Sequence, residues 1–167
     1  MKNYLVTIVL LALVSFSTAA DKKLNALFVM SFGEKGDLPG QLSKPLGVSA
    51  DAKGNIYVSD TGNNRLQKFS PRGELITFIG GFGWDKSQFQ FPIDIFVYNS
   101  LDIFVADFDN NRIQRYDKDL NWLTSYSSNE NWNPKYQFLF PHSVCLSLHG
   151  DFFIVDSEND KVIKLNA

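Results

Sequence analysis

The sequence predicts an all-β protein, and three observations support this fold class. The stretch from Asn55 to Phe69 returns as Asp102 to Tyr116 and again, more loosely, as Asp151 to Leu165. The fifteen Phe residues suit half-buried, pleated strands. Turn residues such as Gly, Pro and Asn separate the short apolar runs. A repeat near 48 residues that is built from short strands indicates the blades of a β-propeller.

Composition limits the classes of protein that remain. The chain has 167 residues, of which 44% are hydrophobic, and this is enough to fill the core of one ordinary domain. Its formal charge of −2 predicts no basic face for a phosphate backbone, so nucleic acid is not an expected partner, although a local basic patch stays open. The single cysteine, Cys145, excludes an intramolecular disulfide.

Residues 1–20 have the pattern of a cleaved secretory signal peptide. Lys2 provides a positive start, Tyr4 to Val14 is an apolar core, and Ser15 to Ala20 is rich in small residues. The apolar run is short for a membrane span. The alternative to a cleaved signal peptide is a retained signal anchor. No cysteine stands near the cleavage region to carry a lipid. A secreted or periplasmic protein without a membrane span in the mature chain is therefore expected.

Residues 21–167 are expected to form the propeller segment, with repeat units at about 44–80, 91–126 and 140–167. Four short antiparallel strands are predicted in each of the first two units and three in the last. In chain order the predicted strands are Leu46–Ala50, Ile56–Ser59, Leu66–Phe69, Leu75–Ile79, Ile93–Val97, Ile103–Ala106, Ile113–Tyr116, Trp122–Tyr126, His142–Leu146, Phe152–Val155 and Val162–Leu165.

Leu24 to Phe32 also has strand composition, and it is predicted to be the outer strand that the last unit lacks. Three blades amount to half of a six-bladed ring, and a half ring leaves two apolar blade faces open to water. Two explanations remain. The sequence is a piece of a longer one, which is the preferred interpretation, or two copies join as a homodimer that completes the ring.

The repeat has an acidic residue at the end of each second strand and a basic residue five positions later. The acidic residue is expected to accept hydrogen bonds from backbone N–H groups of its turn, and the basic residue to pair with a nearby carboxylate. The Asn three positions after the acid is expected to take a positive φ. Because all three blades share the pattern, its role is predicted to be structural. These turn residues are Asp60, Asn63, Arg65, Asp107, Asn110, Arg112, Asp156, Asn159 and Lys161.

These motifs resemble the NHL repeat. The resemblance rests on Pro45-Leu-Gly47, Gly54-Asn-Ile-Tyr-Val58 and Asp60-Thr-Gly-Asn-Asn-Arg65, and on Asp107-Phe-Asp-Asn-Asn-Arg112 in the second unit. The third unit departs from it, with Lys161 in place of Arg and Ser143 in place of Gly47. The resemblance implies a propeller that is usually six-bladed and that most often serves as a binding platform, more rarely as an enzyme.

Residues that differ between the blades are the candidates for a ligand site. Asp94 and His142 follow the prolines that open the innermost strands, and propellers generally bind ligands at the mouth of the channel that these strands surround. Trp84, Trp132 and Tyr136 stand in the longer loops, where they are predicted either to anchor a protein, peptide or glycan or to cover blade edges.

An enzyme remains the alternative. The resemblance implies that the family's peptidyl-hydroxyglycine lyase holds zinc with histidines from several blades, but here only His142 is suitably placed, because His149 falls in a turn. A lactonase-type calcium site needs about six to eight oxygens, and Asp94 is the only obvious inward carboxylate. We therefore expect a non-catalytic binding module without a cofactor. The alternative is a metal-assisted lyase or hydrolase whose other zinc or calcium ligands lie on additional blades.

Overall fold

The computed structural model describes residues 27–128, 131 and 133–166, and their regular structure is almost entirely β-strand. The described strands form two four-stranded sheets and one three-stranded sheet, each antiparallel throughout. The predicted all-β fold is confirmed. Residues 1–20, where a signal peptide is expected, lie outside the described residues.

Blade 1 contains β1 (Gly47–Ala50), β2 (Ile56–Asp60), β3 (Arg65–Phe69) and β4 (Leu75–Gly80). Blade 2 contains β5 (Pro92–Tyr98), β6 (Asp102–Asp107), β7 (Arg112–Asp117) and β8 (Trp122–Ser127). Blade 3 contains β9 (Pro141–Leu146), β10 (Phe152–Asp156) and β11 (Lys161–Leu165). The 3-10 turns η1 (Thr61–Asn63), η2 (Phe108–Asn110) and η4 (Ser157–Asn159) join the second and third strands of each blade, and η3 (Pro134–Tyr136) lies in the loop before β9.

Burial differs between the third and fourth strands of a blade. Every residue of β3 is buried, because other chain segments cover both of its faces, whereas β4 alternates between half-buried and exposed residues. The order of strands in blades 1 and 2 follows the chain, with β1 and β5 at one edge and β4 and β8 at the other. This is the meander that short turns between antiparallel strands produce.

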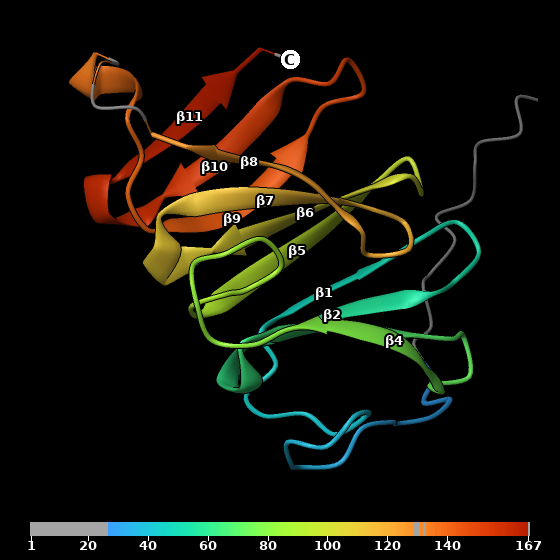
Figure 1. Ribbon diagram of the computed structural model, residues 1–167. Helices are drawn as coiled ribbons and strands as arrows, with labels where there is room; N and C mark the ends of the chain where they lie inside the picture. Colours follow the sequence, from blue (N-terminus) through green and yellow to red (C-terminus); the bar gives the residue numbers. More distant parts are fainter. Residues whose placement is uncertain (1–26, 129–130, 132, 167) are drawn as a thin grey trace, which may run out of the picture. The chain divides into compact units, whose positions relative to one another are not determined.

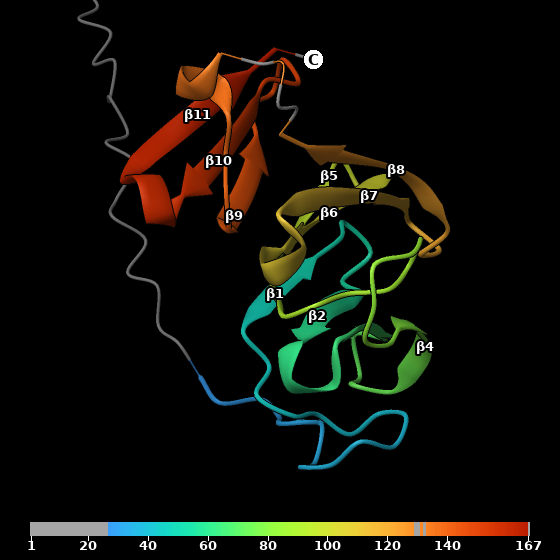
Figure 2. The same ribbon diagram turned by 60° about the vertical axis from the view of Figure 1, so that its left-hand side comes forward.

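The three blades follow one another side by side (Figures 1 and 2), and the core lies between neighbouring blades. The edge strands β1, β5 and β9 lie next to one another in that order. Between blades 1 and 2, Tyr57 and Leu66 pack with Ile95 and Tyr116 of the next blade. Between blades 2 and 3 a second cluster contains Phe104, Ile113, Phe138, Val144 and Ile154. Each of the two interfaces therefore buries a face of one blade against a face of the next.

The strand predicted at Leu24–Phe32 is not present in the described part of that segment. Residues 27–32 have no regular structure, and Leu27, Phe28 and Val29 are 82%, 86% and 85% exposed. A strand requires a hydrogen-bonded neighbour, and no described strand pairs with this segment to hold it extended. Phe32 nevertheless packs on Phe69, with ring centroids 5.0 Å apart. Residues 24–26 lie outside the described residues.

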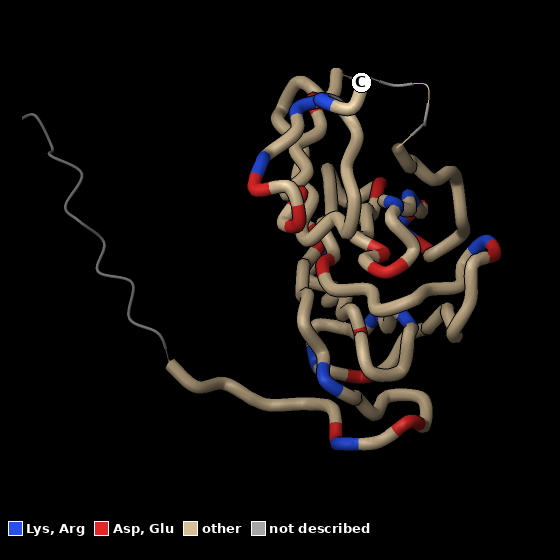
Figure 3. The backbone as a smooth tube through the Cα atoms, turned by 90° about the vertical axis from the view of Figure 1, so that its left-hand side faces the viewer, with Lys and Arg blue, Asp and Glu red and all other residues tan. Residues whose placement is uncertain are grey.

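Acidic and basic residues are mixed along the described chain (Figure 3). The blue and red positions occur both in the turns and loops and within the strands. No helix among the described residues has both the length and the apolar character needed to cross a membrane.

Candidate functional site

The repeated acid of blade 1, Asp60, is fully buried and holds together the end where β2 meets β3. Its Oδ2 accepts hydrogen bonds from Arg65 Nε at 2.7 Å and Asn63 Nδ2 at 2.8 Å. Its Oδ1 accepts the backbone N–H of Ser43 at 2.6 Å. The prediction that the carboxylate binds N–H groups of its own turn was wrong: the backbone donor belongs to the loop that enters the blade.

Blade 2 repeats this geometry around Asp107. The carboxylate accepts hydrogen bonds from Arg112 Nε at 2.7 Å, Asn110 Nδ2 at 2.9 Å and the N–H of Gln90 at 2.8 Å. Burial raises the pKa of the Asp107 carboxyl, although these hydrogen bonds act in the opposite direction. These donors to Asp107 belong to its own blade and to the loop that enters it. The role of this buried carboxylate is therefore structural.

The two arginines also fasten the loops that enter their blades. The remaining guanidinium N–H groups of Arg65 donate to the carbonyls of Asp37, Leu38 and Gln41 at 2.7–2.8 Å. Arg112 makes the same contacts with the carbonyls of Trp84, Asp85 and Gln88. A planar group with five donors can bind several carbonyls at once, which an ammonium cannot do.

Blade 3 holds a weaker version of this network. Lys161 Nζ lies 3.6 Å from Asp156 Oδ2 and donates to the Lys135 carbonyl at 3.5 Å. Both oxygens of Asp156 accept from Asn159 Nδ2. Ile163 stands where the first two blades have Gln67 and Gln114. The replacement of arginine by Lys161 in the third repeat therefore corresponds to a weaker contact with the loop that enters blade 3.

The residue with positive φ in each turn is not the predicted one. Asn64, Asn111 and Asp160 have φ of 51°, 51° and 49°, and each caps its 3-10 turn. The predicted residues Asn63, Asn110 and Asn159 instead lie within the 3-10 turns, where their amides reach the buried acid. In the first two blades two Asn residues are adjacent, so the sequence alone could not tell which of them takes the positive φ.

The left-handed Asn residues link each blade to the next. Asn64 Oδ1 accepts the N–H of Phe91 at 2.9 Å, and Asn111 Oδ1 accepts the N–H of Phe140 at 2.7 Å. Phe91 and Phe140 immediately precede the prolines that open β5 and β9, and both have a positive φ. This interblade hydrogen bond could not be recognised from the sequence alone.

Asp94, the first predicted ligand-binding residue, lies in β5 and is half-buried. Its Oδ2 accepts the hydroxyl of Ser143 at 2.6 Å and the N–H of Val144 at 3.1 Å, both from β9. This oxygen already has two donors from the neighbouring inner strand, so Asp94 positions blade 3 against blade 2.

His142, the second predicted ligand-binding residue, lies in β9 and is exposed. Its ring meets Phe108 edge-on at a centroid distance of 6.4 Å. Phe108 also contacts Phe140 at 5.2 Å and Phe91 at 6.2 Å, so four rings form one group, which we call the aromatic cluster. No hydrogen bond or ion pair joins His142 to Asp94 in the part of the chain that the structure describes. Blades 1 and 3 have Thr61 and Ser157 at the position of Phe108, so the cluster is specific to one place in the repeat.

The donor set does not fit the zinc ion that the lyase alternative requires. Among the described residues, no three His, Cys, Asp or Glu side chains come together as metal ligands. At the position that follows the strand-opening proline, blades 1 and 2 have Leu46 and Ile93 where blade 3 has His142. One imidazole falls short of the three protein ligands typical of catalytic zinc.

The three predicted interaction aromatics have different outcomes. Trp84 is 67% exposed in the loop between β4 and β5, while its carbonyl accepts a hydrogen bond from Arg112. Trp132 lies outside the described residues, and Tyr136 belongs to η3, but its side chain is not described.

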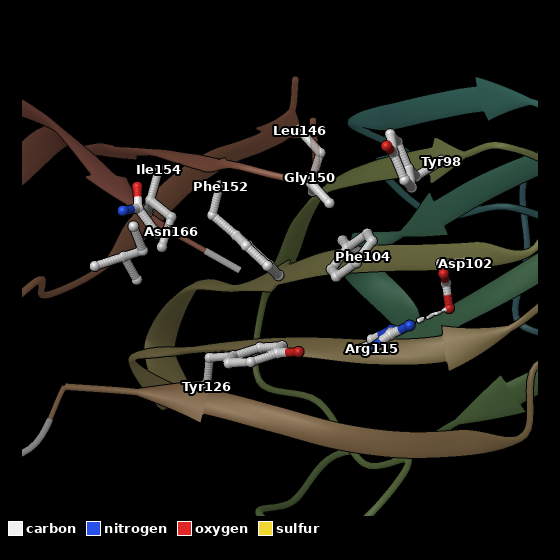
Figure 4. A pocket seen from close by; sticks show the side chains of 11 residues that line it. Tyr98, Asp102, Phe104, Arg115, Tyr126, Leu146, Gly150, Phe152, Ile154 and Asn166 are labelled. Atoms are coloured by element: carbon white, nitrogen blue, oxygen red, sulfur yellow. Dashed lines mark hydrogen bonds and ion pairs between the residues drawn. The ribbon is translucent and has the colours of Figure 1, made fainter. Parts of the chain in front are cut away.

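A pocket of about 580 Å³ between blades 2 and 3 was not predicted (Figure 4). Its lining is largely apolar, with one ion pair in which Arg115 Nη2 lies 2.9 Å from Asp102 Oδ1. Figure 4 shows Phe104 and Tyr126 of blade 2 opposite Phe152 of blade 3. No local pattern in the sequence points to this pocket, because residues from separate segments of both blades meet there.

The corresponding place between blades 1 and 2 explains this pocket. There the turn after β7 covers the blade: Lys68 Nζ and the Tyr57 hydroxyl both donate to the Lys118 carbonyl, at 2.7 and 3.1 Å, and Leu120 is 3% exposed. Phe104 and Arg115 are the counterparts of Tyr57 and Lys68. The pocket is thus the place that a turn fills in the preceding pair of blades.

Comparisons with known proteins agree with this fold. The NHL repeat family model matches residues 42–69. The chain is 32% identical over 131 residues to a protein from Caenorhabditis elegans described as a probable peptidyl-alpha-hydroxyglycine alpha-amidating lyase, a match that covers 74% of this chain and 37% of the relative. It is 36% identical over 87 residues to the brain tumor protein of Drosophila melanogaster, covering 52% of this chain and 8% of that one.

Solved structures show the same architecture. A protein of unknown function from Bacteroides thetaiotaomicron superposes with a TM-score of 0.62 at 18% identity, covering 77% of this chain and 37% of that one. A streptogramin B lyase gives a TM-score of 0.58 at 19% identity, covering 81% and 40%. The chain thus spans well under half the length of these relatives. With its repeated Asp–Arg turns and its meander blades, the chain contains an NHL repeat, matched at residues 42–69, and has the fold of a β-propeller.

Proposed function

We propose that this chain is a non-catalytic binding module that works outside the cytoplasm and recognises a protein, peptide or glycan. The observation that carries the proposal is the aromatic cluster of Phe91, Phe108, Phe140 and His142. The repeated acids and arginines are occupied within their own blades, whereas His142 is exposed and Phe91 is 42% exposed. Exposed rings on a rigid sheet lose little conformational entropy when they bind a partner.

The chemistry of the cluster favours a ligand with an apolar or aromatic face. Aromatic rings pack well against aromatic side chains or the apolar face of a sugar, and an imidazole adds one polar contact. Asp94 supports the cluster indirectly, because it fixes the start of β9, where His142 lies.

Binding to peptide and glycan arrays tests the proposal. Phe108→Thr, which introduces the residue of blade 1, and His142→Ala are each expected to weaken binding about tenfold, since a buried aromatic contact contributes on the order of 1–2 kcal/mol. His149→Ala removes the other imidazole, from the exposed turn between β9 and β10, and is the matched control. Equal binding by the wild type and all three variants would refute the cluster as the site.

A metal-assisted lyase is the second candidate, because one relative described as a probable lyase is 32% identical over 131 residues. On this proposal additional blades would have to supply the missing ligands. Equilibrium dialysis with zinc distinguishes the two. Stoichiometric zinc that is lost in His142→Ala would support the lyase, whereas the binding module predicts no specific zinc uptake by this chain.

The proposal includes export by the expected signal peptide and a homodimer in which two copies complete one ring. Export is tested by amino-terminal sequencing of protein recovered outside the cytoplasm. A mature terminus near residue 21 would support it, and an intact Met1 would oppose it.

A further inference from the structure

The two interfaces between described blades are built to one plan. A buried residue of the third strand of one blade packs against the inner strand and second strand of the next. Leu66 clusters with Ile95 and Val105 between blades 1 and 2. Ile113 clusters with Val144 and Ile154 between blades 2 and 3. A third interface of the same kind would join the counterparts of these residues on the two faces that are left over.

Those counterparts are apolar and exposed. Val162 is the blade 3 counterpart of Leu66 and Ile113, and it is 64% exposed, with Val155 of the neighbouring strand at 38%. Val48 is the blade 1 counterpart of Ile95 and Val144, and it is 69% exposed. Val48 lines a recess of about 240 Å³ together with Leu42, Gly47 and Val58. We call these two surfaces the blade 3 face and the blade 1 face.

The hydrogen bond that links neighbouring blades has an unmatched acceptor residue at the blade 3 face and an unmatched donor at the blade 1 face. In the two complete interfaces the left-handed residue after the 3-10 turn accepts the N–H of the residue that precedes the next strand-opening proline. Asp160 is the left-handed residue of blade 3, and Lys44 precedes the proline of blade 1 and has a positive φ, as Phe91 and Phe140 do. Among the described residues the Lys44 N–H has no backbone or side-chain acceptor. Asp160 and Lys44 also carry opposite charges, so the unmatched acceptor and donor are complementary.

We propose that the blade 3 face of one copy docks on the blade 1 face of a second copy, and that the same contact repeats around a twofold axis. Val162 fills the recess beside Val48, and the Asp160 carboxylate accepts the Lys44 N–H. The inference rests on the homodimer included in the proposed function and names its surfaces. The two faces complement each other, because both are apolar and one has the unmatched acceptor Asp160 where the other has the unmatched Lys44 N–H. This complementarity between two surfaces of one chain is what selects a second copy as the occupant.

Light scattering coupled to size-exclusion chromatography tests the contact on the purified chain at tens of micromolar. The wild type is expected to have the mass of two chains. Val48→Arg and Val162→Asp each place a charge in the apolar contact at both interfaces of the ring, and each alone is expected to be a monomer. Leu101→Arg changes a 62% exposed residue in the turn between β5 and β6 and is expected to leave the dimer intact.

Mixing the two variants provides the decisive result. In a mixed pair one interface is wild type and the other places the introduced arginine opposite the introduced aspartate, so a dimer is expected to form only in the mixture. This rescue also shows that both variants are folded. A monomeric wild type would refute both the homodimer and the contact. A wild-type dimer that survives either substitution, or variants that fail to pair when mixed, would refute the two faces and leave the homodimer standing.

Discussion

Arg65 Nε and Asp60 Oδ2 lie 2.7 Å apart across the turn that joins β2 to β3, and the same two atoms of Arg112 and Asp107 lie 2.7 Å apart in blade 2. The carboxylate of each pair is fully buried. The pair is possible because the antiparallel register places the acid and the base opposite each other. Each arginine then reaches the incoming loop, so one ion pair joins two strands and a loop.

Replacing Arg65 by Lys tests the importance of the planar guanidinium. Lysine can keep the charge beside Asp60 but cannot reach three carbonyls of the loop, whose hydrogen bonds would be lost. We expect a loss of about 2–3 kcal/mol in the free energy of unfolding, measured by urea denaturation. Lys68→Arg, which keeps the charge at a residue of the same strand that donates to a single carbonyl, is the control. A loss equal to that of the control would mean that the loop contacts add no stability.

The reverse exchange in blade 3 should stabilise the protein. Lys161 is 3.6 Å from Asp156 and makes one long contact to the loop. Lys161→Arg would allow the close Nε contact of the other blades, and we expect a gain of about 0.5–1.5 kcal/mol. The same exchange at Lys164, whose side chain is 53% exposed, should change stability by less than about 0.5 kcal/mol. Thermal unfolding measures both, and no difference between them would contradict the structural role assigned to this position.

Asp117 predicts a specific pH dependence of stability. Burial raises the pKa of its carboxyl, but hydrogen bonds from the side chain and backbone of Asn121 and the backbone of Asp119 outweigh this, so the pKa lies below its ordinary value. A lowered folded-state pKa adds stability that is present above the ordinary value near pH 4 and is lost as the pH falls through the folded-state pKa.

The stability difference between wild type and Asp117→Asn should therefore be largest at about pH 6–7 and should shrink below about pH 4. Urea midpoints measured from about pH 2 to pH 7 test this. Asp85→Asn removes the same charge from an exposed loop residue and is the control. A difference that is constant with pH would show that the turn does not favour the ionised carboxylate.

The sequence predicted the strands well and the contacts between blades poorly. Eleven of the twelve predicted strands begin and end within one residue of the observed bounds, because alternation and turn residues are local signals. The strand predicted at Leu24–Phe32 is absent from its described residues 27–32, because a strand depends on a neighbour that no local pattern reveals. The left-handed residue was misplaced by one position where Asn63 and Asn64 are identical in type.

The candidate site was predicted only in part. Comparing the residues after each strand-opening proline singled out His142, and the structure places it in the aromatic cluster. Phe108 was missed. At the same position of the repeat the other blades have the small polar residues Thr61 and Ser157, so aligning the three repeats position by position could have found it. Asp94 was expected to face a ligand, but its bonds to β9 depend on how two blades pack, which a single sequence does not encode locally.

Gly47 is a point of close approach between the inner strands of blades 1 and 2. A Cβ atom there would lie 2.8 Å from Asp94 Cα and 2.9 Å from the backbone nitrogen of Ile95, and 2.6 Å from Ser59 Oγ. Because two of these atoms are backbone of the next blade, side-chain rotation cannot relieve the contact. Gly47→Ala should destabilise the protein by about 1–3 kcal/mol, since extra atoms in a tightly packed interior force the backbone to shift.

Gly81→Ala separates crowding from backbone strain. A Cβ at Gly81 meets no atom within 4 Å, but its φ of 142° is one that glycine adopts readily, so a loss of only about 1 kcal/mol is expected from conformation. Crowding at Gly47 should in addition loosen the contact between β1 and β5, which hydrogen exchange can detect at the Val97 N–H, a donor to Ser49 Oγ. If Gly47→Ala cost no more than Gly81→Ala and left that amide protected, the two inner strands would have to lie farther apart than this structure places them.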